Sequence, residues 1–337
     1  MPNAEQKAVG VELTDGQSYH VPYWRIDSGV PGPRMLVTAA LHGSELQGSE
    51  ALRRFLPEAE QGVVRGSCCL VPFANPVAVR RHQPHIDFEH GRYYGSDSVN
   101  NVNCSWPGKA GGSNAERLSH ALFHALVEDA DCLLDLHCWQ RVRAATGLAR
   151  AGRQDSIDLA NAAGLPFGRR CQWQPEVKER PITPCVLSSY FHDTDRTAAC
   201  VELCGQYGFW SEQVELGLRA IRSSLRHLGL MDGEPEEPPR PTVWLDESEQ
   251  VEVTASCAGV FAPTPVALGD WIGAGTALGH ILTIDDLSTV EVLAPRSGYL
   301  YRLGPTHDRN EEQTRMFLHP YVNQDQTLAE LVDGLPM

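Results

Sequence analysis

Short apolar runs alternate with stretches of helical periodicity along the first two thirds of the chain. Residues 35–41 read MLVTAAL, a β-prone apolar run, and residues 45–56 after it carry apolar positions at the spacing of a helix. The same pattern predicts further strands at residues 67–72, 132–136 and 198–203 and further helices at residues 115–128 and 211–228. This alternation is typical of an α/β fold, with a mixed, mostly parallel sheet flanked by helices.

The pattern changes at a charged, proline-rich stretch, residues 233–242, whose composition suits an exposed linker. Beyond it, glycine and proline punctuate short β-like segments at residues 251–253, 259–263, 277–282, 290–294 and 298–303. The phrases LGDWIGAGTALGHI and LAPRSGYL resemble the barrel-sandwich fold of biotinyl and lipoyl carriers, but this region has no lysine that could carry such a group. With 337 residues, we therefore predict two domains: an α/β domain at 1–232 and a smaller all-β accessory domain at 243–337.

Charge and composition exclude several classes of partner. A net charge of −15 argues against nucleic-acid binding, which needs a basic face. The chain has only three lysines, no run of transmembrane length, and no apolar signal-peptide core in its first residues, MPNAEQKAVGVELTDG. Ten cysteines without CxxC pairs do not form a disulfide framework in a chain of this size. These features predict a cytoplasmic protein with no membrane partner, and they are compatible with a homo-oligomer.

A histidine and a glutamate lie three residues apart where the first predicted strand ends. His42 and Glu45 occupy the turn into the following helix, and His137 follows the predicted strand at residues 132–136. Ligands bind at this carboxyl edge of open α/β sheets. Two histidines and one glutamate leave a fourth position for water, which is typical of a catalytic zinc site. The spacing alone is weak evidence, because a chain with 13 histidines has about one His-x-x-Glu match by chance, and a capping or core histidine is the alternative.

Further motifs accompany this pair in a fixed order along the chain. The series is His42 with Glu45, Asn75-Pro76, Gly91-Arg92-Tyr93, Asn103 with Trp106-Pro107-Gly108, Asp135-Leu136-His137 and Val201-Glu202-Leu203. It resembles the succinylglutamate desuccinylase/aspartoacylase family, a branch of the zinc carboxypeptidase clan, over residues 30–300. The resemblance implies a zinc-carboxypeptidase-like fold and one Zn²⁺ per chain, bound by His42, Glu45 and His137. It also implies hydrolysis of the amide bond of a small N-acyl compound.

Amide hydrolysis also needs a proton acceptor and a group that polarises the carbonyl. Glu202 is the candidate for general base and then acid, because a carboxylate in the apolar strand AACVELCG is costly unless it faces a polar cleft. The alternative is a glutamate on an exposed strand face. Matching the family's Gly-Arg-aromatic segment makes Arg92 the candidate that polarises the carbonyl. The alternative is that Arg92 is a solvated arginine in a loop. Asn103 is expected to position the substrate, and Asp135 either orients the imidazole of His137 or caps a neighbouring loop.

Two cysteines stand where the family carries arginines. The family reads Asn-Arg before its aromatic-Pro-Gly motif and Glu-Leu-Arg-Gly-Gln at its general base, whereas this chain has Cys104 and Cys204 at these positions. In the clan the Asn-Arg pair clamps a substrate carboxylate, a task that suits the planar fork of arginine. The cysteines therefore predict weak turnover of free N-acyl amino acids and better turnover of neutral compounds, unless Arg141 or Arg143 reaches the cleft.

Two other functions stay open at this stage. One is a metallocarboxypeptidase acting on short or modified peptides. The other is a catalytically idle metal-binding or scaffold protein, in which the two cysteines mark relaxed constraint. The presence of all three candidate ligands and of Glu202 favours an active enzyme. Three further histidines, His82, His85 and His90, match no metal-site spacing.

Overall fold

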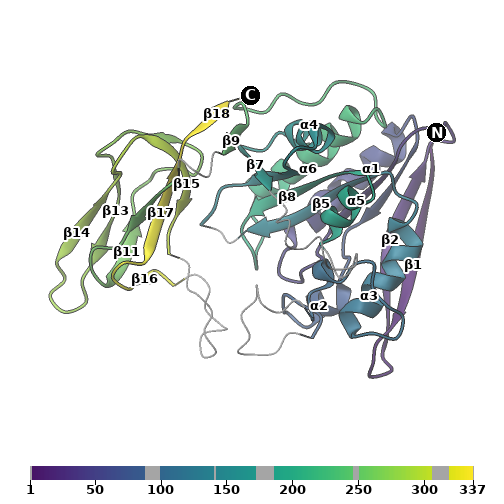
Figure 1. The fold of residues 1–337 in the computed structure, drawn as a ribbon, viewed down its shortest axis with the longest axis horizontal. Helices are drawn as coiled ribbons and strands as arrows, with labels where there is room; N and C mark the ends of the chain where they lie inside the picture. The colour runs from purple at the N-terminus through teal and green to yellow at the C-terminus, as the bar shows by residue number, and fades with distance from the viewer. Residues whose placement is uncertain are drawn as a thin grey trace.

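One large sheet organises the molecule in the computed structural model, which describes residues 2–87, 99–139, 142–171, 186–245, 250–305 and 319–336 (Figure 1). Its strands run in the order β1-β2-β4-β3-β5-β8-β6-β7-β9-β18. Their bounds are β1 (Asn3–Glu12), β2 (Ser18–Asp27), β3 (Arg34–Ala39), β4 (Ser67–Val71), β5 (Cys132–Trp139), β6 (Thr146–Arg150), β7 (Phe167–Cys171), β8 (Thr197–Cys204), β9 (Val243–Leu245) and β18 (Gly334–Pro336). Neighbouring strands are parallel within the stretch β4-β3-β5-β8 and within the stretch β6-β7-β9. The other neighbouring pairs of the sheet are antiparallel. The predicted mixed, mostly parallel sheet is therefore confirmed.

Helices cover both faces of this sheet (Figure 1). Their bounds are α1 (Gln47–Gly62), α2 (Pro76–Arg80), α3 (Asn114–Leu122), α4 (Gln154–Ala163), α5 (Leu187–Asp193) and α6 (Ser211–His227), with a 3-10 turn at Val102–Cys104 and a π turn at Phe123–Val127. The three predicted helices are present. The first differs in its bounds, since α1 begins two residues later than predicted and continues through Pro57.

Burial on both faces explains the continuous apolar runs of the central strands. On β3, Met35 and Val37 join a core with α1, α4 and α6, whereas Leu36 joins a second core with α3 and α5. On β5, Leu134 and Leu136 belong to the first core. Because side chains alternate along a strand, Asp135 and His137 face the side of the second core.

A smaller all-β unit lies beside the large sheet (Figure 1). It consists of two antiparallel four-stranded sheets, one in the order β10-β17-β15-β12 and one in the order β14-β13-β11-β16. Their bounds are β10 (Val251–Thr254), β11 (Gly259–Pro263), β12 (Trp271–Ile272), β13 (Ala277–Leu282), β14 (Thr289–Leu293), β15 (Gly298–Leu303), β16 (Tyr321–Val322) and β17 (Thr327–Val332). Side chains of both sheets, such as Phe261 and Leu331, form one separate core. The predicted β-rich region is therefore present.

The two units meet along the chain segment that follows β5. Ala144 N–H donates to Tyr301 O over 2.9 Å, and Leu303 N–H donates to Val142 O over 2.9 Å, so β15 borders this segment. Strands β9 and β18, which fall in the predicted accessory domain, pair with each other in the large sheet. The division at residues 233–242 itself stays a prediction. Among the described residues no helix combines the length and apolarity needed to cross a bilayer.

Candidate metal centre and active site

A tight turn carries the first two candidate ligands beyond the end of β3. Asn75 fixes this turn, because its Nδ2 donates to Leu41 O over 3.1 Å and its backbone N–H donates to Ala40 O over 3.0 Å. Gly43 is needed inside the turn, since a Cβ there would lie 2.4 Å from Ala78 C and from Gln83 O. The turn therefore holds His42 and Glu45 over the carboxyl end of the sheet.

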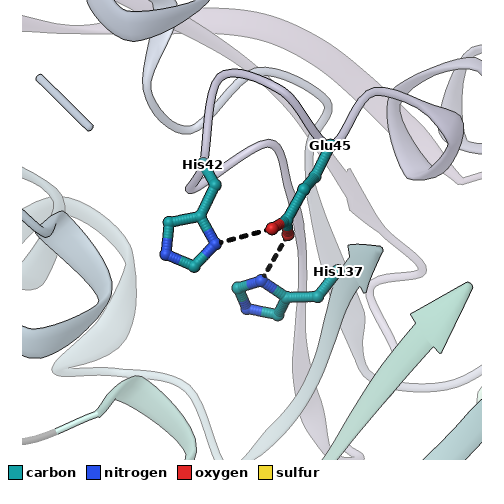
Figure 2. Close-up of side chains that lie close together, drawn as sticks. All are labelled: His42, Glu45 and His137. Atoms are coloured by element: carbon teal, nitrogen blue, oxygen red, sulfur yellow. Dashed lines mark hydrogen bonds and ion pairs between the residues drawn. The ribbon is translucent and has the colours of Figure 1, made fainter. Parts of the chain in front are cut away.

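His42, Glu45 and His137 converge at this edge (Figure 2). The Nδ1 atom of His42 lies 3.0 Å from Glu45 Oε1, and that of His137 lies 2.8 Å from Glu45 Oε2. All three side chains are buried, and their potential ligand atoms lie within 4.8 Å of one another. In the described part of the chain they form the one such group of three or more residues, and they could hold a metal ion.

The other ring nitrogens fit this interpretation, because each faces an acceptor. His42 Nε2 lies 3.1 Å from Asn101 Oδ1, and His137 Nε2 lies 2.9 Å from Asp135 Oδ2. Thr38 Oγ1 donates to Asp135 Oδ1 over 2.6 Å, which fixes this carboxylate in turn. Metal-binding histidines are commonly oriented in this way, with the free nitrogen turned toward the ion.

The electrostatics of the cluster also favour a cation. Burial opposes a charge on His137, but the Asp135 and Glu45 carboxylates outweigh it and raise its pKa well above the usual range. Burial likewise favours the protonated form of Glu45, yet the two histidines hold the pKa of this carboxyl well below its usual range. The Asp135 and Glu45 carboxylates thus stabilise positive charge at this edge of the sheet.

A glutamine that the sequence reasoning missed holds Glu45 in place. Gln206 Nε2 donates to Glu45 Oε1 over 3.1 Å and to Cys138 O over 2.8 Å. The Cys138 N–H donates to Glu45 Oε2 over 3.1 Å. Gln206 ends the segment that matches the family's Glu-Leu-Arg-Gly-Gln, but nothing in a loop sequence gives the direction of its side chain.

Glu202 lies on β8 directly opposite His137 on β5. Its strand neighbours Val201 and Leu203 point into the first core, so Glu202 faces the same side as His137. Glu202 is half-buried, and burial together with Glu45 and Asp135 raises the pKa of its carboxyl to about 8, against the opposing charges of His137 and Arg143. A carboxylate with a raised pKa beside a metal site is suited to accept a proton.

The other predicted residues divide between described and undescribed parts of the chain. Asn103 lies at the site, with Nδ2 3.5 Å from His137 Nε2, and its Oδ1 accepts from Leu187 N–H over 3.2 Å. Burial raises the pKa of the neighbouring Cys104 thiol, and the charge of His137 acts against this rise. Arg92, His90 and Arg141 lie outside the described residues.

His85 is buried beside the site, with its ring centroid 5.5 Å from that of His42. It does not belong to the ligand group, and neither does His82.

The geometry can be compared with known proteins. The family model for the succinylglutamate desuccinylase/aspartoacylase catalytic domain matches residues 31–228, more than half of the chain. The chain belongs to this family. The resemblance inferred from the ordered motifs is thereby confirmed, and the match spans the candidate ligands and Glu202.

Individual relatives of the family agree with this assignment. An N-alpha-acetyl-L-2,4-diaminobutyric acid deacetylase from Halomonas elongata is 26% identical over 279 residues, which cover 80% of this chain and 77% of the relative. The crystal structure of an aspartoacylase family protein from Mesorhizobium loti has a TM-score of 0.71 at 21% identity and covers 100% of this chain and 96% of that one. A product-bound ectoine utilization protein from Ruegeria pomeroyi has a TM-score of 0.70 at 18% identity, with 99% and 98% covered. At these identities the two structures show a shared fold.

Proposed function

We propose that the protein is a zinc-dependent hydrolase that cleaves the amide bond of a small N-acyl compound. The observation that carries this proposal is the buried group His42, Glu45 and His137 with Glu202 on the adjacent strand. Membership of a deacylase family and a relative named as a deacetylase support hydrolysis of N-acyl amides.

The proposed roles follow from position. His42, Glu45 and His137 would hold zinc, which when bound supplies an activated water and polarises the carbonyl oxygen. Glu202 accepts a proton at its carboxylate and returns one to the leaving nitrogen. Asn103 positions the substrate, because its amide lies at the rim of the ligand group. Arg92 stays the proposed group that polarises the carbonyl.

The relative from Halomonas elongata suggests the first compounds to test. We propose an N-acetylated amino compound as the substrate class, with N-acetyl-L-2,4-diaminobutyrate as one member of the panel. The panel also contains N-acyl amino acids, their carboxamides and dipeptides, so that a deacylase and a carboxypeptidase give different products.

The test measures release of free amine from this panel by the zinc-loaded protein, with and without a chelator. We expect chelator-sensitive turnover of N-acyl compounds and one zinc per chain by elemental analysis. His137→Ala removes a ligand, so it should lose both zinc and turnover. His124→Ala is the matched control, because His124 is an exposed histidine that pairs with Glu128, lies against the rings of His120 and Phe123, and is outside the ligand group. Full zinc occupancy in His137→Ala would contradict the ligand assignment, and turnover of dipeptides alone would favour a peptidase.

A further inference from the structure

A polar cavity lies where the small β unit meets the large sheet. Its volume is about 210 Å³, several times the roughly 30 Å³ that a water molecule takes in the liquid. Arg143 and Arg169 line it from the large unit, and Tyr301, Glu252 and Glu330 line it from the small unit. Such a cavity has room for a small polar group with several hydrogen-bonding atoms.

Among the charged groups around the cavity, the Arg143 guanidinium has only a distant ion-pair partner in Glu330. Glu330 is buried, and its Oε1 lies 2.9 Å from the buried guanidinium of Arg302. Arg143 shares this oxygen from 3.5 Å, so Glu330 is already neutralised by the nearer arginine. Arg169 adds a second guanidinium to the wall. Glu252 adds a second carboxylate to the wall, so three guanidinium groups, those of Arg143, Arg169 and Arg302, stand against two carboxylates. This surplus of positive charge suits an anion that Arg143 can bind as a two-pronged donor.

The cavity adjoins the catalytic edge through two side chains. Trp139 lies two residues beyond His137 on the same face of β5, and the Arg143 guanidinium lies 5.6 Å from the centre of its ring.

The second connection runs through a threonine. Thr146 on β6 is paired with Glu202 on β8, and the Thr146 hydroxyl donates to Tyr301 Oη over 3.4 Å. Thr146 and Tyr301 thus connect the strand that carries Glu202 to the wall of the cavity, and the charge of Arg143 acts on the Glu202 carboxylate.

We propose that this cavity is a subsite for a carboxylate on the amine half of the substrate, with Arg143 as the residue that contacts it. Glu330 and the Trp139 ring act as positioning groups, because they hold the guanidinium at the cavity wall. This inference rests on the proposed function. It assigns carboxylate recognition to a residue other than those at the two cysteine positions, and it makes the small β unit part of substrate selection.

The test compares the acid and the carboxamide of whichever N-acyl amino acid of the panel is turned over best. Arg143→Met should raise KM for the acid at least tenfold, with little change in kcat and little change for the carboxamide. Arg296→Met is the matched control, since the Arg296 side chain has the same exposed fraction, 29%, and also pairs with a carboxylate, that of Asp333. Arg143→Lys keeps the charge and should recover part of the loss.

A merely structural role would give a different result. If Arg143 only joined the two units, Arg143→Met would affect the acid and the carboxamide equally, and that result would overturn the proposal. An unchanged KM for the acid would overturn it too.

A binding measurement separates this proposal from the proposed function. L-alanine and L-alaninamide are the probes, observed by saturation-transfer NMR with the full chain. We expect the acid to bind the wild type, and to bind Arg143→Met at least tenfold more weakly. If no compound of the panel is hydrolysed, the proposed function fails while this result still stands. Equal signals from the acid in the wild type and in Arg143→Met would overturn the subsite.

Discussion

Among the described residues, buried charged groups gather in two places, and the charge balance of the two differs. In the small β unit Arg302 faces Glu330, one cation against one anion, 2.9 Å apart. At the edge of the large sheet the Glu45, Asp135 and Glu202 carboxylates share two histidines. In the first cluster the two charges neutralise each other, and the pair has a structural role. The second has three carboxylates for two imidazoles, and this imbalance fits the metal ion that we propose for it.

Breaking the balanced pair should have the largest effect on stability. Arg302→Met leaves Glu330 buried with only the more distant Arg143, so the free energy of unfolding should fall by about 3 kcal/mol, the low end for a broken buried ion pair. Urea unfolding measures this change. The double variant Arg302→Met/Glu330→Leu should recover most of the loss, and a double variant as unstable as the single one would contradict a self-neutralising pair.

Removing a charge from the unbalanced cluster should act on turnover instead. Glu202→Gln keeps the shape of the side chain but cannot accept a proton, so kcat should fall about 10²-fold or more, roughly 2.7 kcal/mol. Stability should hold or rise, because a carboxylate whose pKa burial raises is no longer present. Zinc content is the control and should remain at one per chain. A kcat near the wild-type value would place the proton acceptor elsewhere.

Removing a side chain that positions the proposed metal ligand Glu45, while keeping Glu45 itself, should have a smaller effect on the protein. Gln206→Leu deletes the amide that donates to Glu45, so the zinc dissociation constant should rise about tenfold, the scale of a lost group behind a metal ligand. Chelator competition measures this constant, and kcat at saturating zinc should change little. Gln213→Leu is the control, because Gln213 accepts from Cys204 N–H and contacts no ligand. Equal zinc affinity in both variants would show that Gln206 does not position Glu45.

The smallest effect concerns a histidine in a basic neighbourhood. Burial, together with Arg150 and Arg153, lowers the pKa of His192 to about 4, whereas carboxylates raise that of His137. Because the unfolded chain takes up this proton near pH 6.5, the His192 contribution to stability is full above that pH and is lost as the pH falls toward 4. Between pH 7 and pH 6 the loss should be about 0.7 kcal/mol. His192→Gln should remove it, and His124→Gln, at an exposed site, should not. Equal pH slopes in all three proteins would contradict this shift.

The central strands could be predicted from the sequence because both of their faces are buried. β3, β5 and β8 carry long apolar stretches for this reason, and their ends locate the ligand candidates. The hairpin of β1 and β2 was not predicted, since most of β1 is exposed and lacks an apolar run. Strands β6 and β7 and helix α4 also escaped prediction.

The site shows the same limit. His42, His137 and Glu202 could be proposed because they follow, end or interrupt apolar strands, and Glu45 because it lies three residues after His42. Gln206 and Thr38 act through the direction of single side chains, which the fold sets and no periodicity records. Arg143 stood in the sequence only as one of two arginines beyond His137. The contact between Arg143 and Glu330 joins two residues that lie 187 positions apart in the sequence.

The route of the chain through β9 and β18 has a mechanical consequence. The small β unit leaves the large sheet after β9 and returns to it as β18, and these two strands pair side by side. A unit on a single tether can swivel, whereas this one is held at both ends and along β15 as well. The side of the cavity that carries Tyr301 is therefore tied to the large sheet at several points. If the proposed subsite binds a carboxylate, its walls need little rearrangement, so little ordering entropy should be lost on binding.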